Sequence, residues 1–347
     1  MINVQSFINK ESSHIDLVIA STHAGDYLAD KVVDFYKSKI KYPLLVLKGI
    51  DRFFSDGEIR VRLENSVNGA RVFLIGCFFN MNKDYSINDN LISFLIAVRA
   101  LKEHGARDVI GVIPYMPYAR QDKPTEFTRE PTTIKLICDL LIESGIDRIV
   151  TLEAHSPQLH GFLGKIPLTN ISSIPIFSEV FNRFSNSTNV ISVSPDIGSA
   201  KLIKHFSKEL GTSIVIASKH RPNIEEVEIT ELVGHITNEH DTAIILDDII
   251  STGGTIEAVC RELSKKGISN IYIGSSHLLG VRDFMQKLEY MHKNYGVKKV
   301  YATNSIVHST EALESDLIEI IDISEIIALV INRLYHNKSV SEVFLHD

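Results

Sequence analysis

The chain has 347 residues, of which 44% are hydrophobic and 23% are charged, a composition typical of a globular protein rather than a disordered or fibrous one. At about 100–200 residues per domain, this length predicts two domains. The net charge of −7 argues against sequence-independent binding to nucleic acid, which requires clustered lysine and arginine side chains.

The sequence shows no signal for a disulfide framework, a structural zinc site or a membrane span. Its three cysteines lie far apart and form no CxxC pair, which argues against disulfide and zinc frameworks. The first residues include several charges, so we expect no signal peptide. No uncharged apolar run reaches about 18 residues, so we expect no membrane span. These features favour a reducing cytoplasm as the location.

In the first half, short apolar runs alternate with amphipathic stretches. A helix is predicted from possible N-caps at residues 88–90 to Gly105, because apolar side chains recur between them with helical spacing. A second helix is predicted over residues 132–144, with Gly145 at its end. Buried strands are predicted at residues 17–20, 72–77, 109–113 and 148–152.

The second half repeats this pattern. A helix is predicted over residues 255–266, and a further helix and an amphipathic tail are predicted over residues 281–294 and 311–347. Such alternation is typical of parallel sheets covered by helices. Because Gly and Pro cluster at residues 161–175, we expect domains at 1–165 and 166–347. Strands are predicted at residues 190–193, 214–217, 243–246 and 271–275.

The sharpest motif is AIILDDIISTGGT at residues 243–255, in which an apolar strand is predicted to end at two carboxylates before a helix begins. A helix N-terminus presents unpaired N–H groups and partial positive charge, and glycines let the backbone approach an anion closely. The motif predicts a phosphate cradle at the carboxyl end of a strand. Asp247 and Asp248 suit ribose hydroxyls or a bridging Mg²⁺ ion. Taken alone, the same residues also fit a capped turn and a solvated acidic loop.

This predicted cradle resembles the phosphoribosyl-pyrophosphate signature that phosphoribosyltransferases share with ribose-phosphate pyrophosphokinases. The remaining motifs decide between these families, because phosphoribosyltransferases lack a block like IPYMPYARQDK. In their order along the chain, the motifs resemble the ribose-phosphate pyrophosphokinase family. They are RFFSDGE at residues 52–58, IPYMPYARQDK at 113–123, VTLEAHS at 150–156, SPDIG at 194–198 and KHR at 219–221.

The resemblance implies an α/β fold with two phosphoribosyltransferase-like domains, each a mainly parallel sheet flanked by helices. It implies transfer of the β,γ-diphosphoryl group of MgATP to the C1 hydroxyl of ribose 5-phosphate, which gives phosphoribosyl pyrophosphate and AMP. The chain has no G-x4-G-K-[ST] loop, so ATP must be held in another way. In the family, ATP is partly held by a neighbouring subunit, which implies a homo-oligomer.

The resemblance also assigns the residues that bind ATP. It assigns adenine binding to Phe54, which would stack on the base, and to the carboxylates of Asp56 and Glu58, which would accept hydrogen bonds. Arg120 and Gln121 would contact the rest of ATP. Read without the other motifs, these residues fit an ordinary turn and a solvated charged loop.

Catalytic cations and metal contacts follow in the same way. Lys123, Lys219 and Arg221 are implied to be catalytic, with Lys123 on a loop that closes over the triphosphate. His155 and Asp196 are implied to contact Mg²⁺, although a neutral imidazole is an unusual ligand for a hard cation. A lone histidine, an aspartate in a turn or a basic pair after a strand would otherwise be structural.

The resemblance assigns binding of the acceptor, ribose 5-phosphate, to the predicted cradle. Its hydroxyls are assigned to Asp247 and Asp248, and its 5-phosphate to Ser251, Thr252, Gly253, Gly254 and Thr255.

Departures from the common family pattern keep other functions open. Glu153, Ser251 and His220 replace residues that are more frequent in the family. A related diphosphokinase with a larger ribose-phosphate acceptor, a non-catalytic paralogue in a synthetase complex and a phosphoribosyltransferase are the alternatives. The retained carboxylates, His155 and Lys219 argue against the paralogue, and the YARQDK block argues against the transferase.

Overall fold

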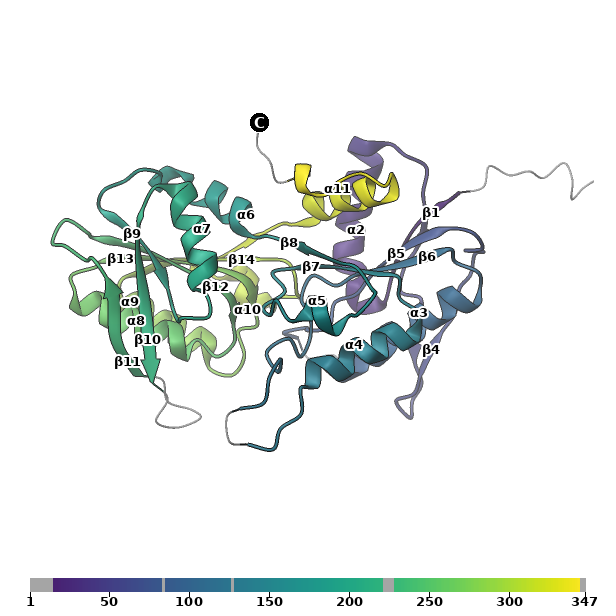
Figure 1. Cartoon of the computed structure of the whole chain (residues 1–347), viewed down its shortest axis with the longest axis horizontal. Helices are drawn as coiled ribbons and strands as arrows, with labels where there is room; N and C mark the ends of the chain where they lie inside the picture. The colour runs from purple at the N-terminus through teal and green to yellow at the C-terminus, as the bar shows by residue number, and fades with distance from the viewer. Residues whose placement is uncertain (1–14, 83–84, 126–127, 221–227, 344–347) are drawn as a thin grey trace, which may run out of the picture.

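The chain folds into two α/β domains that lie side by side, each with one sheet between layers of helices (Figure 1). The computed structural model describes residues 15–82, 85–125, 128–220 and 228–343, and the side chains of residues 219, 220, 228–230 and 342 lie outside that description. Both sheets consist mainly of parallel strands, which confirms the predicted fold class.

The first sheet has six parallel strands in the order β2-β1-β5-β6-β7-β8. Four of them, β1, β5, β6 and β7, confirm the strands that the sequence predicts in the first half. A short antiparallel hairpin forms a separate ribbon. The strands are β1 (Leu17–Ser21), β2 (Leu45–Leu47), β5 (Arg71–Ile75), β6 (Asp108–Val112), β7 (Arg148–Leu152) and β8 (Leu168–Ile171), and the hairpin is β3 (Asp51–Phe53) and β4 (Ile59–Val61).

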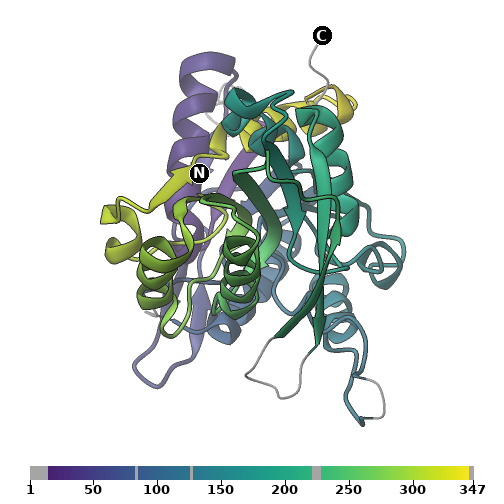
Figure 2. The ribbon, with the colours of Figure 1, turned by 90° about the vertical axis from the view of Figure 1, so that its left-hand side faces the viewer.

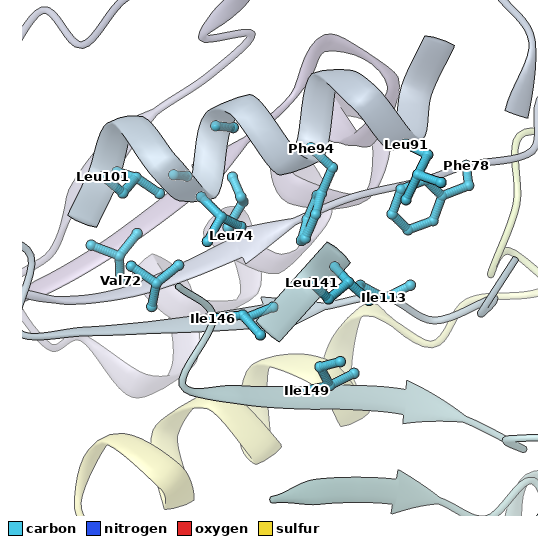
Figure 3. Close-up of a cluster of buried hydrophobic side chains, with 14 of the residues drawn as sticks. Val72, Leu74, Phe78, Leu91, Phe94, Leu101, Ile113, Leu141, Ile146 and Ile149 are labelled. Atoms are coloured by element: carbon cyan, nitrogen blue, oxygen red, sulfur yellow. The ribbon is translucent and has the colours of Figure 1, made fainter. Parts of the chain in front are cut away.

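Helices cover both faces of this sheet. On one face, α3 buries an apolar stripe, and Figure 3 shows its Phe94 and Leu101 facing Val72 and Leu74 of β5, with Leu91 beside Phe78. Burying such side chains contributes about 1.5–3 kcal/mol each, so this stripe holds α3 in place. The helices of this half are α2 (Asp26–Phe35), α3 (Ile87–Glu103), α4 (Thr133–Ser144) and α5 (Leu159–Phe162), with short helical turns at His23–Gly25 and Tyr36–Ile40.

Helix α3 begins earlier than the sequence predicts. Ser86 is its N-cap, and the Ser86 and Asp89 side chains each bond to the other residue's backbone N–H in a capping box. The expected cap at residues 88–90 is therefore wrong, because those residues lie in the first turn. Helix α4 ends at Ser144 with Gly145 in a left-handed conformation, as predicted.

The second sheet has seven strands in the order β11-β10-β9-β12-β13-β14-β15, with β11 antiparallel to β10. Figure 2 shows this domain from its free end, with α8 and α9 on one face of the sheet and α6 and α7 on the other. The strands are β9 (Val190–Ser194), β10 (Ser213–His220), β11 (Glu228–Gly234), β12 (Thr242–Ile250), β13 (Asn270–Leu278), β14 (Val297–Thr303) and β15 (Ile318–Ile321). The helices are α6 (Ile174–Val180), α7 (Ala200–Leu210), α8 (Gly254–Lys265), α9 (Phe284–Tyr295) and α10 (Thr310–Glu314), with helical turns at Asn182–Phe184 and Ser341–Val343.

The two domains exchange elements at their boundary. Strand β8 follows the expected boundary at residue 165 but pairs with β7 of the first sheet. The last helix, α11 (Ser324–Tyr335), lies beside α2 and packs its apolar face on the first sheet (Figure 1). The amphipathic tail thus contributes to the core of the first domain. The division into residues 1–165 and 166–347 stays a prediction, and the sheets change over between Ile171 and Val190.

In the described part of the chain, no helix combines the length and the apolar character that crossing a bilayer requires.

Candidate functional site

The predicted phosphate cradle lies between β12 and α8, at the carboxyl edge of the second sheet. Gly253 has a φ of +76°, a left-handed conformation that glycine adopts without strain. A Cβ atom added there would lie 2.9 Å from the ring of Phe284, so both conformation and space require glycine. Helix α8 begins at Gly254, and its unpaired N–H groups open at this turn. The turn is therefore built to accept an anion.

Asp247 and Asp248 lie within β12, and the expectation that the strand ends before them is wrong. The strand continues to Ile250 because β13 pairs with it along its length. Asp247 Oδ1 accepts a hydrogen bond from Ser199 Oγ at 2.8 Å. Burial and the adjacent charge of Asp248 raise the pKa of Asp247 well above its usual value. Hydroxyl donors or a cation at this pair would favour ionisation of both groups.

His155, which follows β7 in the first domain, contacts Asp248 across the domain interface. Its Nδ1 lies 2.6 Å from Oδ2 of Asp248, and its side chain is 34% exposed. Burial lowers the pKa of His155, but the hydrogen bond and charge of Asp248 outweigh it and raise the pKa above its usual value. Burial likewise opposes ionisation of Asp248, and the His155 contact outweighs it, so the pKa of that carboxyl is lowered. The contact is therefore an ion pair between the two domains.

The backbone that presents His155 is held in an uncommon conformation. The φ angles are +41° at Glu153 and +56° at His155. Residues other than glycine rarely adopt such positive φ angles. Glu153 Oε1 accepts hydrogen bonds from the backbone N–H of Ser173 at 2.6 Å and from Ser172 Oγ at 3.1 Å. Glu153 thus anchors the His155 segment to the chain that leads into the second domain.

His277 supplies a second link between the domains. Its Nε2 lies 2.8 Å from the backbone oxygen of Leu152, and its Nδ1 lies 2.8 Å from Ser305 Oγ. Burial lowers the pKa of His277 to about 4, so the imidazole is neutral and donates from Nε2 to the Leu152 carbonyl. Sequence reasoning gave this histidine no role, and nothing local in the sequence points to a partner 125 residues away.

A hollow of about 760 Å³ joins the cradle to the first domain. Its lining includes the turn at residues 251–255, Asp247 and, from the YARQDK block, Arg120. The charge of Arg120 also acts on His155. The structure thus brings together the motif from the first half and the cradle from the second half, which are more than a hundred residues apart in sequence.

The segment between β13 and α9, together with the first turn of α9, forms another wall of the hollow. It contributes Arg282, Asp283 and Lys287, which sequence reasoning did not assign to a site. The mixed charges of the predicted helix at residues 281–294 were the only signal, and such charges are more often found on a solvated face.

The predicted adenine residues lie elsewhere on the chain. Phe54, Asp56 and Glu58 are exposed at the tip of the β3–β4 hairpin, and none of them lines the hollow. Figure 1 shows β4 at the right of the molecule and the second domain at the left. Phe54 is 49% exposed, and the guanidinium carbon of Arg60 lies 5.6 Å from the centre of its ring. Within one chain, the hairpin and the cradle are not brought together.

Gln121 and Lys123 lie in the loop that leads from β6 to α4. Both side chains are exposed, and neither lines the hollow in the part of the loop that the structure describes. One hydrogen bond attaches the start of this loop to α4, because the backbone N–H of Ile134 donates to the carbonyl of Gln121 at 3.3 Å. Asp122, between them, was not assigned, and its charge reaches His155.

The predicted metal contacts do not form a preassembled cluster. Asp196 follows β9, its Oδ1 accepts from the backbone N–H of Ser199 at 3.0 Å, and its charge raises the pKa of Asp247 further. Among the described residues, no three His, Cys, Asp or Glu side chains are grouped so that they could hold a metal ion. This donor set fits Mg²⁺ only as an ion with few protein ligands that keeps water and takes phosphate oxygens. The assignment of His155 and Asp196 stays a prediction.

The two remaining catalytic candidates, Lys219 and Arg221, lie where the described residues end before the gap at 221–227. Lys219 lies within β10, which continues to His220, so the expectation that it follows the strand is wrong. The Lys219 side chain and all of Arg221 lie outside the described residues.

Comparisons with known proteins agree on one family. Two family models match, described as the N-terminal domain of ribose phosphate pyrophosphokinase, at residues 17–145, and as a phosphoribosyl synthetase-associated domain, at residues 191–345. The ribose-phosphate pyrophosphokinase of Bacillus cereus is 34% identical over 85% of this chain and 88% of its own length. That of Staphylococcus aureus (strain Mu50) is 33% identical over 97% of this chain and 99% of its own.

A solved structure extends the likeness to the arrangement of the domains. The phosphoribosylpyrophosphate synthetase of Mycobacterium smegmatis superposes with a TM-score of 0.80 at 26% identity, over 93% of this chain and 99% of that one. Sequence and fold are thus similar over nearly the whole chain.

Proposed function

The chain belongs to the ribose-phosphate pyrophosphokinase family, and from this premise we propose that it transfers the β,γ-diphosphoryl group of MgATP to the C1 hydroxyl of ribose 5-phosphate. The products are phosphoribosyl pyrophosphate and AMP. The observation that supports this most directly is that Arg120, from the predicted ATP block, lines the same hollow as the phosphate cradle. A nucleotide bound at Arg120 would face an acceptor bound at residues 251–255.

On the acceptor side, we propose that the cradle binds the 5-phosphate and that Asp247 and Asp248 bind the ribose hydroxyls. The first turn of α8 offers unpaired N–H groups, and Ser251, Thr252 and Thr255 offer hydroxyls. Asp248 is ionised in its contact with His155, so it is ready to accept hydrogen bonds from hydroxyl groups.

On the nucleotide side, we propose that each site takes its adenine contacts from a neighbouring subunit. The exposed hairpin with Phe54, Asp56 and Glu58 lies away from the hollow of its own chain. An exposed aromatic ring with flanking carboxylates can stack on a base and accept from its amino group, provided another subunit presents the rest of the site. A homo-oligomer is therefore part of the proposal.

A Mg²⁺ ion would be held mainly by the ATP phosphates, with His155 and Asp196 as protein contacts. Nε2 of His155 has no hydrogen bond among the described residues. It would contact the ion only as a neutral imidazole, which gives up the Nε2 proton of the ion pair and still donates from Nδ1 to Asp248 Oδ2. When bound, the ion would supply positive charge to the triphosphate. Asp247 and Asp248 are adjacent carboxylates, and a cation bound beside them would offset the repulsion that raises the pKa of Asp247.

The transfer itself is an in-line displacement at the β-phosphorus. The C1 oxygen forms a bond to that phosphorus, the bond between the β-phosphorus and the α,β-bridging oxygen breaks, and the bridging oxygen leaves with AMP. Charge spreads over non-bridging oxygens, so catalysis depends mainly on positioning and neutralisation. We assign that neutralisation to Lys123, Lys219 and Arg221, and expect Asp248 to accept the hydroxyl proton.

The test is to incubate the purified chain with MgATP and ribose 5-phosphate and to analyse the products by mass spectrometry. Equal amounts of AMP and phosphoribosyl pyrophosphate are expected. Formation of ADP and a ribose bisphosphate would overturn the proposal, because it indicates transfer of a single phosphoryl group.

A panel of acceptors separates the remaining alternatives. If AMP forms only with a larger ribose-phosphate acceptor, the chain is a related diphosphokinase. If no acceptor yields AMP, it is a non-catalytic member of the family. Ribose without the phosphate is the control, because it cannot use the cradle.

A further inference from the structure

The residues of the cradle carry no positive charge that could neutralise a bound phosphate. Residues 251–255 include no cation, and Asp247 and Asp248 come just before them. A phosphate monoester carries about −1.5 to −2 charges near pH 7, while a helix N-terminus offers about +0.5. A bound acceptor phosphate therefore needs positive charge from another element.

The wall formed by the β13–α9 segment and the first turn of α9 supplies that charge. Among the described residues that line the hollow, the cations are Arg120, Arg282 and Lys287. Arg120 belongs to the first domain and to the proposed nucleotide side. Arg282 and Lys287 therefore remain for the acceptor side.

This wall is fixed to the cradle along its length. The backbone N–H of Leu279 donates to the carbonyl of Ile250 at 2.8 Å, and that of Val281 donates to the carbonyl of Ser251 at 3.1 Å. The Phe284 ring lies against Gly253. Any charge that the wall presents is thus held in a fixed place relative to the phosphate turn.

Lys287 is the cation that reaches the turn itself. Its ammonium lies 3.4 Å from the carbonyl oxygen of Thr252, and its side chain is only 27% exposed. Its other partner is Asp283, one helical turn earlier, at 3.1 Å. Asp283 is 51% exposed, so this pair is at the solvent side and leaves the ammonium able to exchange one anion for another.

We propose that Lys287 is a further acceptor-binding residue, which neutralises the 5-phosphate in the cradle and selects phosphorylated acceptors over neutral ones. The proposal deepens the proposed function and rests on the acceptor binding at residues 251–255. Asp283 competes with the phosphate for the same ammonium. The contact of Lys287 with Asp283 therefore lowers acceptor affinity, and its contact with the phosphate raises it.

The experiment uses matched pairs on one helix. Lys287→Met keeps length and helix propensity but removes the charge. Lys293→Met is its control, because Lys293 also has an acidic partner four residues earlier, Glu289 at 3.7 Å, but is 70% exposed. Asp283→Asn keeps a good N-cap residue, and Glu289→Gln is its control.

We expect Lys287→Met to raise KM for ribose 5-phosphate about tenfold, while KM for MgATP changes less than about twofold. Lys287→Arg should stay within about threefold of wild type, because it keeps the charge. Asp283→Asn should lower KM for ribose 5-phosphate about twofold, and both control variants should resemble wild type. Equal rises in both KM values, or weaker acceptor binding in Asp283→Asn, would mean that Lys287 only braces the helix and would overturn the proposal.

Calorimetric titration of wild type and Lys287→Met with inorganic phosphate separates this inference from the proposed function. Phosphate binding that depends on Lys287 in a chain that releases no AMP would refute the proposed function and retain this site. AMP release with phosphate and acceptor affinities that do not depend on Lys287 would retain the function and refute this site.

Discussion

The acceptor side and the nucleotide side of the hollow are built in different ways. The acceptor side is one continuous stretch, residues 247–255, with Gly253 buried against Phe284 and backbone bonds to the next wall. The nucleotide side takes its candidates from separate segments, and Phe54, Arg120 and Lys123 are all exposed. One side is a preformed cradle, and the other consists of exposed side chains from separate segments.

This difference teaches where substitutions should act. A change on the acceptor side disturbs a packed geometry, so it should affect catalysis strongly even when it is small. A change on the nucleotide side removes a single exposed contact, so it should weaken binding of ATP and leave the fold intact. The following predictions test this contrast, in order of expected effect.

The largest effect is expected from Asp248→Asn, which removes the negative charge that pairs with His155 and that we propose for binding a ribose hydroxyl. We expect kcat/KM to fall about 10³-fold, as for loss of a preorganised electrostatic contact. Steady-state release of AMP measures this, with the exposed Asp34→Asn as control. An unchanged pH–rate profile in Asp248→Asn would remove this carboxylate from accepting the hydroxyl proton.

His277 links the two domains, and its burial predicts a pH dependence of stability. Its pKa is about 4 in the folded chain against 6.5 for an ordinary histidine. Between these values the unfolded chain binds more protons, so stability is full above pH 6.5 and is lost as pH falls towards 4. At about 1.4 kcal/mol per pKa unit, the contribution is about 3 kcal/mol.

The variant His277→Gln isolates this contribution, because glutamine can still donate to the Leu152 carbonyl but does not titrate. Urea unfolding at pH 7.5 and pH 4.5 should show a smaller loss of stability in the variant than in wild type. If both lose the same amount, a protonated His277 is tolerated in the folded chain, and the link between the domains is not the neutral hydrogen bond described here.

Glycine substitutions test the preformed cradle directly. Gly253→Ala adds a Cβ atom 2.9 Å from the Phe284 ring at a φ of +76°. Gly164→Ala is the matched control, because its φ is +58° and no atom lies within 4 Å of the added Cβ. Both incur backbone strain of about 1 kcal/mol, but only Gly253→Ala must also shift the turn, so we expect kcat/KM for ribose 5-phosphate to fall about 10²-fold in that variant alone. Equal effects would show that the cradle adjusts and is not preformed.

The same contrast explains what the sequence could predict. The cradle is local, so glycines, hydroxyls and a following helix within one stretch were enough to predict the turn at Gly253 and the start of α8. Local apolar runs also predicted β1, β5, β6, β7, β9, β10, β12 and β13, whereas no strand was predicted at β2, β3, β4, β8, β11, β14 or β15. Even there, local reasoning ended β12 too early, because only pairing with β13 carries the strand through Asp247 and Asp248.

Features that depend on distant contacts were not predictable from local patterns. The bond from His277 to Leu152 and the packing of α11 on the first sheet join residues that the chain brings together only by folding. The sequence predicted a helix over residues 281–294 without a role, and only the structure shows Lys287 beside Thr252. The adenine residues were named by resemblance, and their distance from the cradle within one chain could not be read from the sequence.

The smallest effect is expected on the nucleotide side, from Phe54→Ala. Removing one exposed stacking ring should raise KM for MgATP about tenfold and leave the thermal unfolding midpoint unchanged. Tyr290→Ala is the control, because Tyr290 has the same 49% exposure on a different face of the chain. A fall in kcat without a change in KM would place Phe54 in the reacting geometry rather than in nucleotide binding.

Mixed oligomers of Phe54→Ala and Asp248→Asn subunits test whether one site takes its hairpin and its cradle from the same chain. Phe54→Ala retains its cradle, and Asp248→Asn retains its hairpin, so each is defective for a different reason. If a site uses the hairpin of a neighbouring subunit, some sites in a mixed oligomer combine an intact hairpin with an intact cradle. Activity at low ATP should then rise several-fold above the sum of the separate variants. If the hairpin serves the hollow of its own chain, no mixed site is complete and the activities simply add.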